Sequence, residues 1–378
     1  MDIICYSHLR WNFVYQRPQH LLSRMARHFR IFYIEEPIFD ADRPFLDNQQ
    51  NEDKVWVVVP HLKAGLPEHE IEEQQNILLK DFLDYFECRE FIAWYYTPMA
   101  IGLNPTFSPS LVVYDCMDEL AAFKNAPASL KEKEADLLHN ADIVFTGGYS
   151  LYNAKKDKHP NVYLFPSSID RKHFEKARNL QTDAVDQQHI PFPRIGFFGV
   201  VDERMDIALL EAIADKKPGW HFVIIGPVVK IDPETLPRRN NIHYLGPKSY
   251  KELPFYIAKW NVAMMPFAMN ESTRFISPTK TPEYLAAGKP VVSTAIFDVV
   301  KFYGDTGLAH IAEDANGFVA AIQDALDIPD SAKWLKTVDL SLSANSWDKT
   351  VEKMMFYIKN ALEAKNAEGV KQKEDEYV

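Results

Sequence analysis

The chain has 378 residues, of which 47% are hydrophobic, and this length favours two domains over a single ordinary core. Its formal net charge of −11 argues against a nucleic-acid-binding protein, which normally carries a basic surface. The sequence shows neither a secretory signal nor the roughly 18–20 consecutive apolar residues that span a bilayer. Because its three cysteines form no metal or disulfide pattern, we expect a protein of the reducing cytoplasm.

The first half of the sequence alternates short apolar runs with amphipathic segments, a pattern typical of parallel strands joined by helices. We expect strands at 2–6, 31–35, 55–60, 92–97, 111–115, 142–146 and 161–165. We expect helices at 18–29, 69–88, 128–139 and from residue 149 onward. The alternation predicts a doubly wound α/β domain over residues 1–175.

Charged and amide residues then interrupt the apolar pattern, which predicts a linker at 176–193. The alternation resumes and predicts a second doubly wound domain at 194–345. Its expected strands are 194–199, 221–226, 242–245, 262–267 and 290–294, and its expected helices are 205–214, 249–260 and one ending at Ala287. Ser249 and Glu252 form the capping box of the second helix. A last helix is expected at 346–364, followed by a disordered tail at 365–378.

The most informative stretch is 277–292, in which a loop carrying Lys280 turns into a short helix that Gly288 ends before a buried strand. We interpret Thr281 and Pro282 as the cap and first residue of that helix, with Ser277 as an alternative cap. Backbone N–H groups and a positive helix end beside Lys280 suit a diphosphate. Glu283 in the first turn suits a ribose hydroxyl pair. The alternative is a well-capped surface helix whose charges are only solvated.

Several segments in the same order resemble the GT-B glycosyltransferases, particularly family 4 and the group with the teichuronic-acid and xanthan-type bacterial transferases. The matching residues are 195–199, 241–246 with the helix 253–260, 262–267, 277–292 and the segment 165–174. The resemblance implies two Rossmann-like domains facing across a cleft, with the last helix crossing back to the first domain. It also implies a nucleotide-sugar donor, most often a UDP-sugar, in the second domain and an acceptor in the first. No metal and no cofactor are expected.

By this resemblance Lys280 binds the donor diphosphate, Glu283 the ribose, and Gly199 with the loop 200–204 approaches the phosphates. Ser277 and Thr279 of the same motif complete the expected donor set. The sequence departs from the family pattern at Phe275, Val200 and, roughly, Glu203, where many family members carry a glutamate, an arginine and a lysine. Arg204 or Arg274 is expected to replace the missing positive charge. Because of these departures, retention and inversion of the anomeric configuration both stay open.

Asp115 and Asp118 follow a predicted strand in the first domain, at the end where α/β sheets bind ligands. The xanthan-type transferases use an aspartate in this region as general base, and Asp118 is the better match. Such a base suits an inverting displacement, because a carboxylate can remove the proton of the acceptor hydroxyl. The alternative is that both aspartates cap the next helix or bind backbone amides.

The loop 7–17 joins the first strand to the first helix and is expected to contribute to the acceptor site. Aromatic rings in it suit stacking on a sugar, and its basic side chains suit an anionic group. The candidates are His8, Arg10, Trp11, Tyr15 and Arg17, together with Ser150 after a later strand. The glycines before Ser150 fit either a close approach to a ligand or a tight turn.

Five arginines and no acidic residue occur between Arg10 and Arg30, so the helix over Arg17–Arg30 is a candidate for peripheral contact with anionic lipid at the inner face of the membrane. A solvated amphipathic helix explains the same pattern. Two further functions stay open beside a glycosyltransferase with a glycan or lipid-linked acceptor. One is a sugar-nucleotide epimerase of the same fold, and the other is a scaffold that binds a nucleotide sugar without turnover. A nicotinamide dehydrogenase is disfavoured because the Gly-x-Gly-x-x-Gly fingerprint is incomplete.

Overall fold

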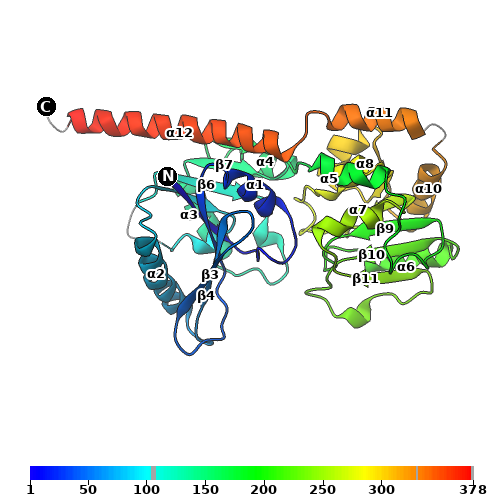
Figure 1. Ribbon diagram of the computed structural model, residues 1–378, viewed down its shortest axis with the longest axis horizontal. Helices are drawn as coiled ribbons and strands as arrows, with labels where there is room; N and C mark the ends of the chain where they lie inside the picture. The colour runs from blue at the N-terminus through cyan, green and yellow to red at the C-terminus, as the bar shows by residue number, and fades with distance from the viewer. Residues whose placement is uncertain (104–107, 329–330, 376–378) are drawn as a thin grey trace. The chain divides into compact units, whose positions relative to one another are not determined.

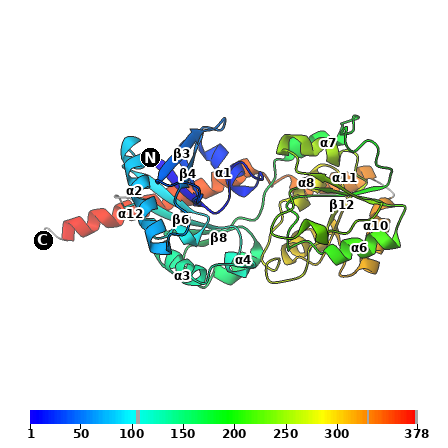
Figure 2. The same ribbon diagram turned by 90° about the horizontal axis from the view of Figure 1, so that it is seen from below.

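The computed structural model describes residues 1–103, 108–328 and 331–375. The chain divides into two compact units, one made of Met1–Pro166 with Asp348–Val378 and the other of Ser167–Trp347. We call them the N-terminal unit and the C-terminal unit. Figures 1 and 2 show that each is built around a β-sheet with helices against it, which confirms the prediction of two doubly wound α/β domains.

The sheet of the N-terminal unit has the strand order β3-β4-β2-β1-β5-β6-β7-β8. The strands are β1 (Asp2–Ser7), β2 (Arg30–Glu35), β3 (Phe45–Gln50), β4 (Val55–His61), β5 (Phe91–Tyr95), β6 (Leu111–Cys116), β7 (Ile143–Thr146) and β8 (Val162–Leu164). The predicted strands are all present, and they pair in parallel. The antiparallel edge strand β3 was not predicted, because its exposed sequence Leu-Asp-Asn-Gln-Gln lacks an apolar pattern.

The crossover from β1 runs one way along the sheet and those from β4 onward run the other way. Because such crossovers are right-handed, α1 covers one face of the sheet and α2, α3 and α4 cover the other. These helices are α1 (Arg17–Met25), α2 (Glu68–Tyr85), α3 (Leu130–Asn140) and α4 (Tyr149–Lys155), with the short 3₁₀ helices η1 (Pro98–Ala100) and η2 (Leu120–Ala122) between strands and helices.

The last helix, α12 (Trp347–Asp375), belongs with the N-terminal unit from Asp348 onward. Tyr357 stacks on Tyr163 of β8 with ring centroids 3.9 Å apart, and Asp348 lies 3.3 Å from Nε of Arg24 on α1. The helix continues beyond residue 364, so the expected disorder of 365–375 is wrong. The Ala, Glu, Lys and Gln residues of this stretch are strong helix formers, which explains the extension. Residues 376–378 lie outside the described residues.

The C-terminal unit has a parallel sheet with the order β11-β10-β9-β12-β13-β14. The strands are β9 (Arg194–Phe198), β10 (His221–Ile225), β11 (Ile242–Gly246), β12 (Val262–Met265), β13 (Val291–Ser293) and β14 (Ala309–Ile311). The helices are α5 (Arg171–Glu175), α6 (Ile207–Lys216), α7 (Leu253–Ile257), α8 (Lys280–Ala286), α9 (Phe297–Val299), α10 (Ala315–Leu326) and α11 (Ser331–Leu342). No element between 300 and 345 was predicted: β14 is too short to show a period of its own, and the helices α10 and α11 were missed.

The segment 176–193, expected as a linker, packs within the C-terminal unit. Gln187 is fully buried there, where its Oε1 accepts a hydrogen bond from Nε1 of Trp260 at 2.9 Å. Its Nε2 donates to the backbone oxygen of Tyr256 at 3.1 Å. Gln187, one of the polar residues that suggested a linker, therefore satisfies buried groups, and the two units divide between Pro166 and Ser167 instead.

Each sheet has a position where the direction of winding reverses. In the N-terminal unit it lies between β1 and β5, and in the C-terminal unit between β9 and β12. Doubly wound sheets bind their ligands outside the carboxyl ends of the strands at such a switch point. These two positions therefore locate the regions in which to look for function.

Candidate functional site

Gly199 and Lys280 meet at the switch point of the C-terminal unit. Gly199 follows β9 with a φ of +139°, a region that favours glycine. A Cβ atom at this position would collide with Cε of Lys280 and lie 2.8 Å from its Nζ. The ammonium also lies 5.8 Å and 5.9 Å from the ring centroids of Phe197 and Phe267. The glycine thus lets a lysine cation lie directly over the carboxyl end of β9.

A second glycine, Gly226 at the end of β10, makes this arrangement tighter. Its φ is +145°, and a Cβ atom there would collide with the backbone oxygen of Gly199. The backbones after two neighbouring strands therefore touch without side chains between them. Gly226 was not among the predicted site residues, although a glycine at the end of a predicted strand was the available signal.

Helix α8 begins at Lys280 after Thr279, so the expected cap at Thr281 is wrong. Thr281 is fully buried inside the helix, with its hydroxyl 3.5 Å from Sδ of Met265. Pro282 is then the third helical residue, whose missing N–H has no intrahelical partner in any case, so it costs no hydrogen bond. Gly288 ends the helix as predicted, with a φ of +75°.

Glu283 lies on α8 with 3% of its surface exposed. Burial raises the pKa of this carboxyl to about 7, against the opposing effects of the Lys280 charge and a hydrogen bond with Thr279. Its Oε2 has no hydrogen-bond partner among the described residues. Buried carboxylate oxygens are rarely left in this state, so the atom has the capacity to accept a hydrogen bond from a ligand hydroxyl.

The other expected donor residues are held by groups of their own unit. The backbone oxygen of Ser277 accepts a hydrogen bond from Oγ of Ser167 at 2.6 Å. Arg204 binds both carboxylate oxygens of Asp202, at 2.7–3.1 Å. Arg274 is exposed, 3.9 Å from Glu271, and lies over the ring of Phe275. Both arginines that were expected to supply positive charge to the donor site are therefore engaged with carboxylates in this structure.

Arg17 and Asp115 form a buried ion pair in the N-terminal unit. Nε of Arg17 lies 3.1 Å from both carboxylate oxygens, and a terminal nitrogen lies 2.8 Å from Oδ1. The other terminal nitrogen donates to the backbone oxygen of Phe165. Arg17 is 3% and Asp115 0% exposed. Arg17, expected to bind the acceptor, and Asp115, one of the two expected catalytic carboxylates, are thus paired with each other inside the fold.

Asp118 follows β6 and is half-buried, so it keeps the exposure that a general base requires. Its neighbour Met117 packs against Gly147, where a Cβ atom would lie 2.9 Å from Cα of Met117. Gly147 is therefore required by the close contact of two chain segments. This agrees with the second interpretation of these glycines, a tight turn before the helix. Ser150, half-buried in the first turn of α4, follows this turn.

The loop 7–17 is fixed by a carboxylate that sequence reasoning missed. Glu35, at the end of β2, accepts a hydrogen bond from the backbone N–H of Trp11 at 2.7 Å and pairs with Arg10 at 3.0 Å. Trp11 is buried edge-on against Tyr33, whereas Tyr15 is partly exposed and packs on His20. His8 is half-buried in the same loop. Of the expected stacking rings, Tyr15 alone keeps an exposed surface.

Helix α1 buries the side that was expected to meet lipid. Leu21, Leu22 and Met25 are fully buried in the N-terminal unit, and Arg24 pairs with Asp348. The apolar face of the Arg17–Arg30 segment therefore lies in a protein core and is not available to lipid. In the part of the chain that the structure describes, no helix combines the length and apolarity needed to cross a membrane.

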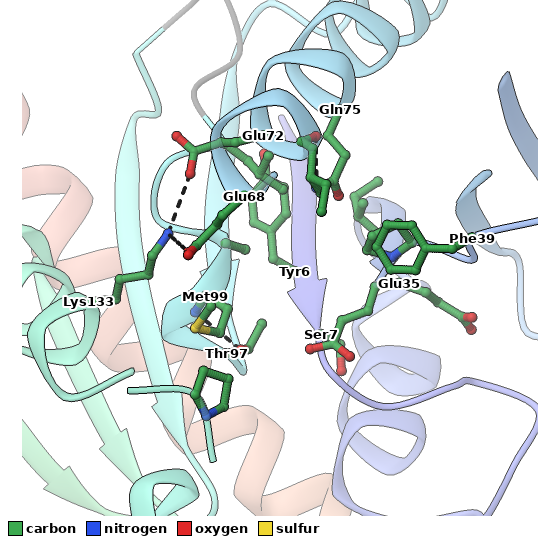
Figure 3. Close-up of a pocket in the computed structure, with 17 residues that line it drawn as sticks. Tyr6, Ser7, Glu35, Phe39, Glu68, Glu72, Gln75, Thr97, Met99 and Lys133 are labelled. Atoms are coloured by element: carbon green, nitrogen blue, oxygen red, sulfur yellow. Dashed lines mark hydrogen bonds and ion pairs between the residues drawn. The ribbon is translucent and has the colours of Figure 1, made fainter. Parts of the chain in front are cut away.

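A cavity of about 410 Å³ lies at the switch point of the N-terminal unit (Figure 3). The ends of β1 and β2, the first turns of α2, the helix η1 and Lys133 of α3 form its walls. The carboxylate-rich helix α2 was predicted from the sequence but was not assigned to a site. The position of α2 relative to β1 is set only when the sheet forms, so the cavity could not be predicted from the sequence.

Within residues 1–103, 108–328 and 331–375, no group of three or more His, Cys, Asp or Glu side chains is placed to hold a metal ion. Cys5, Cys88 and Cys116 are buried free thiols.

Comparison with known sequences identifies a relationship in the C-terminal unit. Residues 193–327 match the family described as Glycosyl transferases group 1. A Bacillus subtilis protein whose name assigns it to teichuronic acid biosynthesis as a glycosyltransferase is 26% identical over 217 residues. The match covers 53% of this chain and 54% of that protein, so the chain spans about half the length of the curated relative.

Solved structures resemble the chain over nearly its whole length. Sucrose-phosphate synthase from Thermosynechococcus elongatus has a TM-score of 0.71 and 16% identity, covering 96% of this chain and 99% of its own. An Escherichia coli structure described as trehalose-6-phosphate bound with UDP-2-fluoro glucose has a TM-score of 0.69 and 12% identity. The match covers 96% of this chain and 99% of that chain. The catalytic domain of starch synthase IV from Arabidopsis thaliana, bound to ADP and acarbose, has a TM-score of 0.64 and 10% identity. The match again covers 96% of this chain and 99% of that chain. The chain has the GT-B glycosyltransferase fold, as its sequence resemblance implied.

Proposed function

We propose that this protein is a glycosyltransferase that moves a sugar from a UDP-sugar to a hydroxyl group of a glycan or lipid-linked acceptor in cell-surface polysaccharide synthesis. The family match over 193–327 and the name of the Bacillus subtilis relative support this proposal. The observation that carries it is the arrangement of Gly199, Lys280 and Glu283 at the switch point of the C-terminal unit.

The donor is held by two groups with separate roles. The ammonium of Lys280, over the glycine backbone after β9, neutralises the diphosphate that leaves with the electron pair of the broken glycosidic bond. Glu283 accepts hydrogen bonds from the ribose hydroxyls through its unpartnered oxygen. A lysine in this position performs the task that a bound cation performs elsewhere, so we expect activity without a metal.

The acceptor hydroxyl attacks the anomeric carbon while a carboxylate removes its proton. Asp118 is the group that we assign to this role, because Asp115 is committed to Arg17 and Asp118 is partly exposed. The proton ends on the Asp118 carboxylate, the new glycosidic bond forms, and the nucleoside diphosphate departs. This sequence inverts the anomeric configuration.

The test is thermal unfolding with UDP, GDP, ADP and TDP, each with and without magnesium. A ligand at about 100 times its dissociation constant adds about 2.7 kcal/mol to the free energy of unfolding, which shifts Tm by several degrees. We expect a metal-independent shift with UDP that Lys280→Ala abolishes. Lys216→Ala, which removes an exposed lysine at the end of α6, is the matched control and should keep the shift. The absence of a shift with every nucleotide would overturn the proposal.

A scaffold that binds a nucleotide sugar without turnover is the second candidate. The observation that favours it is the pairing of Arg204 with Asp202 and of Arg274 with Glu271. Incubation with a UDP-sugar and a panel of acceptors separates the candidates. A nucleotide shift without a glycosylated product would favour the scaffold, and a new sugar nucleotide formed without acceptor would identify an epimerase.

A further inference from the structure

The cavity of the N-terminal unit lies where ligands of doubly wound sheets bind. Tyr6 and Ser7 end β1, and Thr97 follows β5, on the two sides of the switch point. Its volume of about 410 Å³ falls within the range of small-molecule sites, roughly 300–1,000 Å³. Figure 3 shows side chains from β1, α2 and the segment after β5 around one open space.

The charged groups around the cavity are already paired. Nζ of Lys133 lies 3.2 Å from Glu68 and 3.4 Å from Glu72 (Figure 3). On the opposite side, Glu35 is bound by Arg10 from outside the cavity, and Glu36 adds a further carboxylate. Within the described part of the chain, four carboxylates and one lysine line the cavity. An anionic ligand would therefore face a net negative wall whose lysine is shared by two carboxylates.

The carboxylate of Glu72 is held in place by close packing. A Cβ atom at Gly102 would collide with the Glu72 carboxyl group, so the glycine makes room for it. Nδ2 of Asn76, one helical turn along α2, donates to the backbone oxygen of Gly102 at 3.1 Å. The position of the Glu72 carboxylate in this wall is therefore fixed by its packing against Gly102.

The hydroxyl group of Tyr6 has no hydrogen-bond partner among the described residues, although Tyr6 is 1% exposed. Its ring stacks on Tyr95 with centroids 5.0 Å apart, which fixes its direction. Burial raises the pKa of this phenol well above its usual value, so it stays protonated and can both donate and accept. A buried polar atom of this kind, in a residue that lines the cavity, has the capacity to bond to a ligand hydroxyl group.

We infer that this cavity binds an uncharged sugar residue of the acceptor and excludes sugars that carry a phosphate or a carboxylate. The hydroxyls of such a residue bond to Tyr6 and to the carboxylates, while Ile71, Met99 and Leu103 contact its C–H faces. The inference rests on the proposed function for the identification of the ligand as an acceptor, but sugar binding by the cavity is measurable without turnover.

Saturation-transfer NMR with the purified full chain tests it. The neutral probes are the p-nitrophenyl glycosides of glucose, galactose, mannose, N-acetylglucosamine and N-acetylgalactosamine. The anionic probes are p-nitrophenyl glucuronide and glucose 6-phosphate. We expect at least one neutral probe to bind tenfold or more tightly than either anionic probe. Glu36→Lys, at an exposed residue of the cavity rim, should strengthen the binding of the anionic probes. The difference in affinity between neutral and anionic probes should then become smaller.

A variant that fills the cavity tests whether the neutral probe binds there. Met99→Trp should weaken the neutral probe at least tenfold, whereas Met269→Trp, at an exposed methionine of the C-terminal unit, should leave it unchanged. The inference is overturned if no neutral probe binds, if an anionic probe binds as tightly, or if Met99→Trp has no effect. The UDP-dependent Tm shift is measured on the same samples. If the inference fails but the UDP-dependent Tm shift is retained, the proposed function still holds. If the Tm shift is absent, the proposed function is contradicted independently of the inference.

Discussion

Lys280 extends across Gly199 so closely that no residue with a Cβ atom fits at position 199 while the lysine stays where it is. The two residues lie 81 positions apart in the sequence and come together because β9 and β12 flank the switch point of one sheet. A glycine at a strand end therefore does more here than permit a turn, because it determines where the cation lies.

Gly199→Ala should displace Lys280 and weaken UDP binding at least tenfold. The flexible end of the lysine can move aside, so the loss should appear in the binding constant more than in the fold, apart from the backbone strain at a φ of +139°. Isothermal titration with UDP measures the effect. Gly219→Ala is the matched control, since nothing lies within 4 Å of its added methyl group. Equal affinities for the two variants would contradict the role of this contact.

Glu283→Gln should make the free energy of unfolding of the ligand-free protein less dependent on pH. The folded-state pKa of Glu283 is raised from 4.5 to about 7. Its protonated form therefore stabilises the fold fully below pH 4.5, and this contribution is lost as the pH rises through 7. The glutamine cannot ionise, so the variant should gain stability relative to the wild type between pH 5 and pH 8, on the order of 1–3 kcal/mol.

Urea unfolding at pH 5, 6, 7 and 8 measures this difference. Glu271→Gln serves as the control, because it makes the same substitution at an exposed carboxylate of the same unit. A constant difference between wild type and Glu283→Gln across this range would show that the buried carboxyl does not titrate there.

Asp115→Ala should lower the free energy of unfolding by about 3–5 kcal/mol, because it leaves the buried Arg17 guanidinium without its counter-ion. Chemical denaturation measures the loss. Replacing both partners, with Arg17→Met in the same chain, should recover part of it, since the uncompensated charge is then removed. If the single variant were as stable as the wild type, the ion pair would not be the reason for keeping this aspartate.

Asp118→Asn should leave Tm within about 1–2 °C of the wild type and lower kcat by about 10²–10⁴-fold, the usual contribution of a general base. The KM for the UDP-sugar should change little, because the donor is assigned to the other unit. Steady-state kinetics with an acceptor identified by the probe panel measures both constants. An unchanged kcat would remove Asp118 from the mechanism.

The alternation of apolar runs and amphipathic segments was enough to predict both doubly wound units, because parallel strands buried on both faces need continuous apolar sequence. The motif around Lys280 was also predictable, since a lysine, a short helix and the stopping Gly288 are adjacent in the chain. Elements without a local pattern were missed, such as the polar edge strand β3 and the three-residue strand β14.

Pairings between distant residues were decided by the tertiary structure alone. Arg17 and Asp115 each looked like a site residue, and their 98-residue separation gave no sign that they neutralise each other in the core. The apolar side of α1 suited lipid as well as a protein interior until the fold buried it. The period of the apolar residues in a sequence determines which side chains lie on each face of a strand or helix. Which of them meet depends on strand order and register, and these arise only when the whole sheet forms.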